Sequence, residues 1–183
     1  MNQSKYPTLL IALSLLLTSY AVQAKTKNKT QYNNKQIRIS FLSRTPEQIG
    51  AFYEGRGFSK AMVNKLKQQC FITVGIHNKS RQVIWLDLAN WTFTNSEGEF
   101  KRATRAHWKA VWQKMAIPLA HQSTFRWTLL PEKLDFRANE HEGGNIILPF
   151  LNKPFTLQAH FKTKTDKSGK AFSIQINNLK CAR

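Results

Sequence analysis

Cysteine is scarce in this chain of 183 residues, which contains only Cys70 and Cys181. The absence of any C-x-x-C spacing excludes the common redox-active dithiol motif and the common zinc motifs. No cysteine occurs in the first 69 positions, so none there can accept the lipid of a bacterial lipoprotein. In an oxidising compartment an even pair predicts a disulfide, here closing a loop of about 110 residues and holding the C-terminus against the middle of the fold.

Long apolar runs are absent after the first 24 residues, which excludes a further membrane-spanning helix from the sequence pattern. Residues 1–24 combine Lys5 with an apolar run over residues 9–22 and end in Val22-Gln23-Ala24. This run is shorter than the roughly 20 residues that a spanning helix needs. The pattern predicts a cleaved signal peptide over residues 1–24 and a periplasmic or secreted product with no transmembrane segment after cleavage.

Acidic residues are few, because ten Asp and Glu stand against 28 Lys and Arg, giving a formal net charge of +18. Such an excess indicates which partners a protein attracts and says nothing about its fold. We expect a protein partner or an anionic envelope component, and no specific nucleic acid. Residues 25–36 are polar and lysine-rich without an acid, which predicts a disordered basic arm.

Motifs of catalysis are also missing. The chain has no Gly-x-Ser-x-Gly elbow and no Ser-x-x-Lys. Residues 141–145, HEGGN, match part of the H-E-x-x-H zinc motif, but Asn145 occupies the second ligand position and the two glycines disfavour a helix. We interpret the glycines as a turn or bulge. The histidines lack ligand spacing along the chain, so the sequence predicts no catalytic residue, metal or cofactor. The alternative is that folding gathers several histidines around copper or zinc, with Met115 as a further ligand.

Alternating apolar and polar residues predict short strands over most of the chain. The clearest pair is residues 155–162 and 172–177, which flank the turn signal of residues 166–169 and predict a hairpin. Residues 83–93 predict one long or bulged strand, and Phe125, Trp127 and Leu129 alternate with polar residues as in a strand. About seven strands predict a mainly β chain, an immunoglobulin-like antiparallel sandwich in a single domain over residues 37–183.

Two helical insertions, at about 46–69 and 104–116, interrupt the strand pattern. Thr45, Pro46 and Gln48 supply a capping hydroxyl, a first-turn proline and a capping-box glutamine in the right order. Ser59 can cap a second helix in the first insertion, and Thr104 can cap the helix of the second.

The strongest candidate for a binding site is the basic helix of the second insertion. Its Arg102, Arg105 and Lys109 follow an i, i+3, i+7 spacing and form a cationic ridge, while Trp108 and Trp112 lie on the apolar side. A helix of this kind binds a membrane interface or an acidic groove, or packs its apolar side on its own domain. These five residues are the candidate binding residues.

Together these patterns predict an exported, non-enzymatic binding or accessory domain that acts through protein or cell-envelope contacts. One alternative is a polyanion or lipopolysaccharide binder that uses the basic, tryptophan-bearing helix. Another is a metal-dependent enzyme or copper-handling protein with histidines grouped by folding.

Overall fold

A computed structural model describes residues 29–183, so the predicted signal peptide over residues 1–24 and the first part of the predicted arm lie outside the described residues. In chain order the elements are β1 (Lys29–Asn33), β2 (Ile37–Arg44), α1 (Pro46–Glu54), α2 (Lys60–Lys67), β3 (Gln69–Asn78), β4 (Ile84–Asp87), a 3-10 helix (Leu88–Asn90), β5 (Trp91–Asn95), β6 (Gly98–Phe100), α3 (Arg105–Lys114), α4 (Leu119–Trp127), β7 (Lys133–Phe136), β8 (His141–Pro149), β9 (Phe155–Thr163) and β10 (Phe172–Leu179). None of the helices in this part of the chain is long and apolar enough to cross a membrane.

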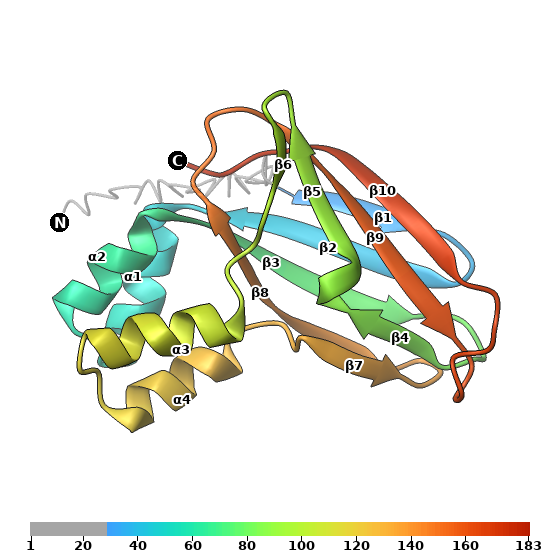
Figure 1. Cartoon of the computed structure of the whole chain (residues 1–183), viewed down its shortest axis with the longest axis horizontal. Helices are drawn as coiled ribbons and strands as arrows, with labels where there is room; N and C mark the ends of the chain where they lie inside the picture. The colour runs from blue at the N-terminus through green and yellow to red at the C-terminus, as the bar shows by residue number, and fades with distance from the viewer. Residues whose placement is uncertain (1–28) are drawn as a thin grey trace, which may run out of the picture.

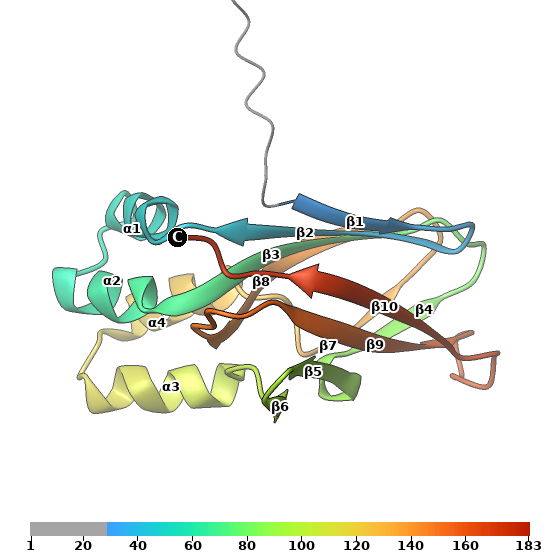
Figure 2. The same cartoon turned by 90° about the horizontal axis from the view of Figure 1, so that it is seen from above.

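The strands form two antiparallel sheets that pack as a sandwich (Figure 1 and Figure 2). One sheet has the order β1-β2-β3-β8, and the other has the order β6-β5-β9-β4-β7 with β10 paired to β9. The α-helices α1, α2, α3 and α4 gather at one end of the strands. The predicted mainly β sandwich is confirmed, with ten strands over residues 29–183 where about seven were predicted; the immunoglobulin-like arrangement is not confirmed.

The sandwich core is built by side chains that alternate along each strand. Ile37, Ile39 and Phe41 of β2 are fully buried, and the residues between them face outward or are half-buried. The predicted hairpin is confirmed, because β9 and β10 pair with Phe161 opposite Phe172. Apolar residues on one face of each strand therefore meet between the sheets, as the period of two requires.

A second core lies between the helices and the outer face of the first sheet. Phe71 of β3 and Ile147 of β8 are register partners, and both belong to this helical core. Cys70 and Ile72, which flank Phe71 in the chain, belong to the sandwich core. Tyr53 of α1 is buried here, and its hydroxyl lies 2.7 Å from Oγ1 of Thr128. Burial raises the pKa of Tyr53 to about 12. The first residues of β3 are thus covered on both faces, which anchors the helices to the sheet.

The predicted disulfide is present between Cys70 and Cys181. Cys70 is the second residue of β3 and belongs to the sandwich core, and the backbone carbonyl of Lys180 accepts a hydrogen bond from the Ser43 hydroxyl of β2. The end of the chain is therefore held on the first sheet by a covalent bond and a hydrogen bond.

The predicted disordered arm over residues 25–36 is corrected for the part that the structure describes. Lys29–Asn33 forms β1, which pairs with β2 over five residue pairs from Lys29 opposite Leu42 to Asn33 opposite Arg38. The side chains of β1 are exposed or half-buried, and its sequence KTQYN has no alternation of apolar and polar residues. Backbone hydrogen bonds to the neighbouring strand stabilise this segment, and composition carries no signal of them.

Residues 83–93 do not form one strand. Asp87 ends β4, its Oδ1 accepts a hydrogen bond from the Ala89 backbone N–H at 3.0 Å, and a 3-10 helix separates β4 from β5. Both strands pair with β9, at different positions along it. The break lets one apolar run supply two strands of the same sheet.

The strand predicted from Phe125, Trp127 and Leu129 is wrong, because residues 119–127 form α4. Phe125 and Leu129 are buried, but Trp127 is 83% exposed, so the alternating residues do not share a buried face. Phe125 lies on the buried face of α4, whereas Leu129 follows the end of the helix and forms an isolated bridge with Asn145 of β8.

Candidate functional site

A pocket of about 460 Å³ lies between α3 and α4. We call it the α3–α4 pocket; its lining residues are Arg105, Ala106, Trp108, Lys109, Trp112, Leu119, Gln122, Ser123, Phe125, Arg126 and Leu129. Its volume falls in the range of about 300 to 1,000 Å³ that small-molecule sites occupy. Four of the five predicted binding residues line it, and Arg102 does not.

Aromatic rings form the floor of the pocket. Trp108 and Trp112 are one helical turn apart on α3, are 2% and 1% exposed, and stack with ring centroids 5.0 Å apart. Phe125 of α4 contacts both, at centroid distances of 5.2 Å and 5.1 Å. The apolar side of the basic helix therefore packs on its own domain, which removes both tryptophans from any flat contact with a membrane surface.

Three cationic side chains stand around this floor. Arg105 and Lys109 come from successive turns of α3, and Arg126 comes from α4. The lining residues include no carboxylate, and neither Lys109 nor Arg126 takes part in an ion pair within residues 29–183. The pocket is therefore apolar at its base and positively charged at its rim.

Arg105 is the most constrained of the three cations. One Nη donates a hydrogen bond to the Leu129 backbone carbonyl at 2.7 Å, while its Nε is buried and has no hydrogen-bond partner in the described chain. Partial burial lowers the pKa of Arg105, and the nearby charge of Arg126 lowers it further, against the opposing effect of Glu132. Because an arginine stays charged in proteins, an anion bound beside Arg105 and Arg126 would relieve an unfavourable charge arrangement.

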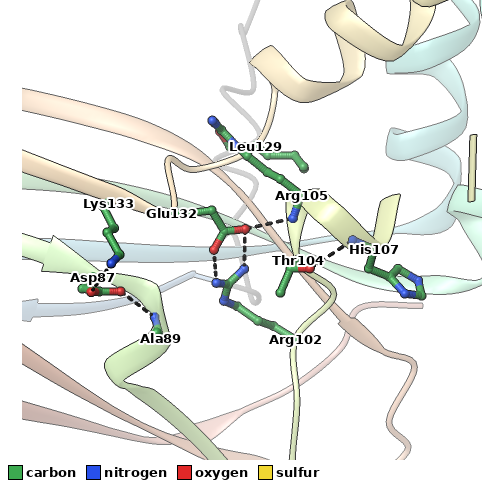
Figure 3. A network of polar contacts seen from close by, with 9 residues as sticks. All are labelled: Asp87, Ala89, Arg102, Thr104, Arg105, His107, Leu129, Glu132 and Lys133. Atoms are coloured by element: carbon green, nitrogen blue, oxygen red, sulfur yellow. Dashed lines mark hydrogen bonds and ion pairs between the residues drawn. The ribbon is translucent and has the colours of Figure 1, made fainter. Parts of the chain in front are cut away.

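Arg102 has a structural role, because it is paired with Glu132 (Figure 3). Both Nη atoms of Arg102 donate to the two carboxylate oxygens, and the Arg105 backbone N–H donates to the same carboxylate at 2.9 Å. The Thr104 hydroxyl accepts from the His107 backbone N–H at 3.0 Å, which confirms the predicted cap of α3. The network fixes the first turn of α3, and so the position of Arg105, against the loop before β7.

Substitution of Glu132 by glutamine should weaken the fold in a pH-dependent way. Partial burial by itself would raise the pKa of Glu132, but hydrogen bonds from Arg102 and Arg105 and the charges of both arginines outweigh it and lower the pKa. We expect E132Q to lower the free energy of unfolding by about 2 kcal/mol at neutral pH, since the pair is only partly buried. A lowered pKa in the folded state stabilises the protein above the ordinary pKa of glutamate, and this contribution disappears as pH falls through the lowered value.

Urea unfolding at pH 7, pH 5 and pH 3 measures this effect, and the difference between wild type and E132Q should shrink toward pH 3. The matched control is E97Q, which removes an exposed pair with Lys153 and should change stability by about 0.5 kcal/mol or less. Equal losses in the two variants, or a loss independent of pH, would contradict the assigned role of Glu132.

Histidines are brought together at one place away from the α3–α4 pocket. His77 of β3 and His141 of β8 are register partners, and their rings stack with centroids 3.8 Å apart. Partial burial and the positive charges of His141, Arg38 and Lys79 lower the pKa of His77. Over residues 29–183 no group of three or more His, Cys, Asp or Glu is placed to hold a metal ion.

Sequence reasoning missed the half of the pocket that comes from α4. Leu119, Gln122, Ser123 and Arg126 line the pocket, but the strand prediction for this segment gave them no common face. The available signal was Pro118 directly before Leu119, because proline favours a helix start.

Comparisons with known proteins do not extend this description. No protein-family model matches the chain, and no curated protein matches it. Among solved structures it is similar to a Bacillus subtilis protein described as a candidate lipoprotein, with 13% identity, a TM-score of 0.41, and coverage of 81% of this chain and 38% of that one. The chain thus spans well under half of that protein. A likeness this distant carries no argument about function, and the comparisons place the chain in no family.

Proposed function

We propose that the protein is an exported, non-enzymatic binding domain whose α3–α4 pocket holds an anionic amphiphile of the cell envelope. One observation carries this proposal: an aromatic floor lies under three cations, and no carboxylate lines the pocket. An apolar chain would cover the floor and Leu119, which is 79% exposed. A carboxylate or phosphate head group would lie among Arg105, Lys109 and Arg126.

Two energetic terms support this class of ligand. Burial of apolar surface contributes about 0.8 kcal/mol per CH₂ group, which gives the affinity but little selectivity. The head group adds charge-assisted hydrogen bonds to arginine, which are stronger than those between neutral groups and favour carboxylates and phosphates. A neutral chain would gain only the first term.

Export is supported by residues outside the pocket. The Cys70–Cys181 disulfide is of the kind that persists in oxidising compartments. The predicted signal peptide over residues 1–24 agrees with the same compartment. An envelope amphiphile is a ligand that such a protein would encounter there.

Fatty acids of increasing length test the proposal directly. We expect titration calorimetry below the micelle concentration to show dodecanoate binding with 1:1 stoichiometry. Affinity should rise about threefold to fourfold for each CH₂ from octanoate to dodecanoate. Dodecyl maltoside, which has the same chain and an uncharged head, should bind at least about tenfold more weakly.

Paired charge variants locate the head group. We expect the double variant K109Q/R126Q to bind dodecanoate at least about tenfold more weakly. The control K114Q/R137Q removes the same net charge from exposed positions that do not line the pocket and should bind like wild type. S123F, which places a ring at the pocket wall, should abolish binding. Equal weakening in both double variants, or no dodecanoate binding by the wild type, would exclude the proposal.

A further inference from the structure

A second pocket, of about 410 Å³, lies on the other side of α4 and shares no lining residue with the α3–α4 pocket. Its walls come from the end of β2, from α1, from Thr73 of β3, from the end of α4 and from the Gly143–Asn145 part of β8. We call it the Trp127 pocket. Nothing in the proposed binding of amphiphiles uses it.

Trp127 presents an uncovered indole face at this pocket. It is 83% exposed, whereas Trp91, Trp108 and Trp112 are at most 5% exposed and Trp85 is half-buried. No aromatic ring of residues 29–183 stacks on Trp127. Large side chains of this type dominate the energetics of binding interfaces when they become covered.

Polar side chains line the same pocket as Trp127 and are held by hydrogen bonds. Arg44 donates from Nε to the Thr73 hydroxyl at 2.9 Å, and that hydroxyl donates to Oδ1 of Asn145 at 2.8 Å. Gln48 accepts from the Thr45 backbone N–H through Oε1 at 3.2 Å as part of the capping box of α1. The Nη atoms of Arg44 and Nε2 of Gln48 make no hydrogen bond within residues 29–183, so oriented donors remain for a ligand.

We infer that the Trp127 pocket binds an acidic saccharide unit. The C–H face of a pyranose ring covers a flat indole, and the ring hydroxyls accept from amide donors such as Nε2 of Gln48, which lines this pocket. The guanidinium of Arg44 matches a uronate carboxylate with two parallel hydrogen bonds. A single-stranded nucleic acid also stacks bases on aromatic rings, but it needs a line of cations along its backbone, and Arg44 is the one cation that lines the pocket.

Nuclear magnetic resonance of the folded protein provides the test, with tetragalacturonate as the probe. We expect the probe to shift the Trp127 indole N–H resonance, and W127A to weaken binding at least about tenfold, since it removes the stacking surface. W127F keeps a flat ring and should bind within about threefold of wild type. R44Q should weaken tetragalacturonate about tenfold and leave the uncharged analogue maltotetraose unaffected.

The matched control is L119A, which truncates another exposed apolar side chain of the same helix and should leave tetragalacturonate binding unchanged. W127A should also leave dodecanoate binding unchanged, so failure of this inference and failure of the proposed function are distinguishable. No shift at about 10 mM probe, where even a complex with a Kd of about 1 mM is nearly saturated, would overturn the inference. Trp127-dependent binding of oligothymidylate without saccharide binding would overturn it as well.

Discussion

We expect the loss of the Cys70–Cys181 disulfide to be the most destabilising change that leaves the rest of the chain intact. The bond closes a separation of 111 residues along the sequence. In the chain-entropy model, a cross-link of this span removes enough freedom from the unfolded chain to contribute about 5 kcal/mol. For a protein whose net stability is about 5 to 15 kcal/mol, this is a large part of the total.

The native contacts of the C-terminal segment add a local effect. Leu179, two residues before Cys181, and Ala182, directly after it, are 3% and 8% exposed. Without the covalent bond, release of this segment would uncover that apolar surface and the edge of the sandwich core. We therefore expect loss of protection from hydrogen exchange first in the residues after β10.

Guanidinium unfolding of three samples measures the effect: oxidised wild type, reduced wild type and the double variant C70A/C181A. Reduced wild type and the double variant should lose similar stability, because both lack the cross-link. The intact mass of the oxidised protein should show no thiol available to alkylation. Two reactive thiols in that sample, or a loss under about 1 kcal/mol in the double variant, would contradict the role of the bond.

The second large effect should come from Gly144. A Cβ built at this position lies 2.4 Å from the Leu130 backbone nitrogen and 2.6 Å from its Cα. The approach is this close because the Leu130 N–H donates to the Asn145 carbonyl at 3.0 Å and the Asn145 N–H donates to the Thr128 carbonyl at 2.8 Å. The chain after α4 therefore runs along the outer edge of β8, and a methyl group would push the two backbones apart.

We expect G144A to lower the free energy of unfolding by about 3 kcal/mol, because the clash is with backbone and cannot be relieved by a side-chain rotation. The control is G50A in α1, where the nearest atom is Cδ of Lys67 at 3.4 Å, part of a flexible side chain. G50A should be neutral or stabilising, since alanine favours a helix over glycine. Urea unfolding of both variants checks the difference, and similar stability of G144A and wild type would contradict the close approach.

Gly144 also shows how a sequence pattern can single out an important residue but predict the wrong structural reason for it. The sequence places two glycines together at residues 143 and 144, which predicted a turn or bulge, but β8 continues through both and pairs with Val74 and Gly75 of β3. Glycine is needed because another segment passes close by, and that segment lies in a different part of the chain. A local pattern cannot distinguish these two reasons.

Elements whose stabilising contacts are local were predicted well. The capping box of α1 is present, with the Gln48 backbone N–H donating to the Thr45 hydroxyl at 3.3 Å. The β9–β10 hairpin is present in the expected orientation, since Phe155, Leu157, Ala159 and Phe161 are all buried. Capping and strand alternation depend on residues a few positions apart, so the sequence contains the whole signal.

The candidate sites were predicted only in part. The cationic ridge of α3 was visible in the spacing of Arg105 and Lys109, and both line the α3–α4 pocket. Arg126 and Trp127 were not visible as site residues, because their roles depend on α4 being a helix and on what lies on each side of it. Arg102 was assigned to binding because no spacing rule identifies Glu132, 30 positions away, as its partner.

By itself, the sequence determined the mainly β character, the cystine pair and the basic helix, because periodicity, composition and a single pair of cysteines each leave few alternatives. Tertiary structure decided which faces of the helices are covered, which charges are neutralised and where two pockets open around α4. These outcomes depend on contacts between residues far apart along the chain, and such contacts follow from how apolar surfaces fit together in space.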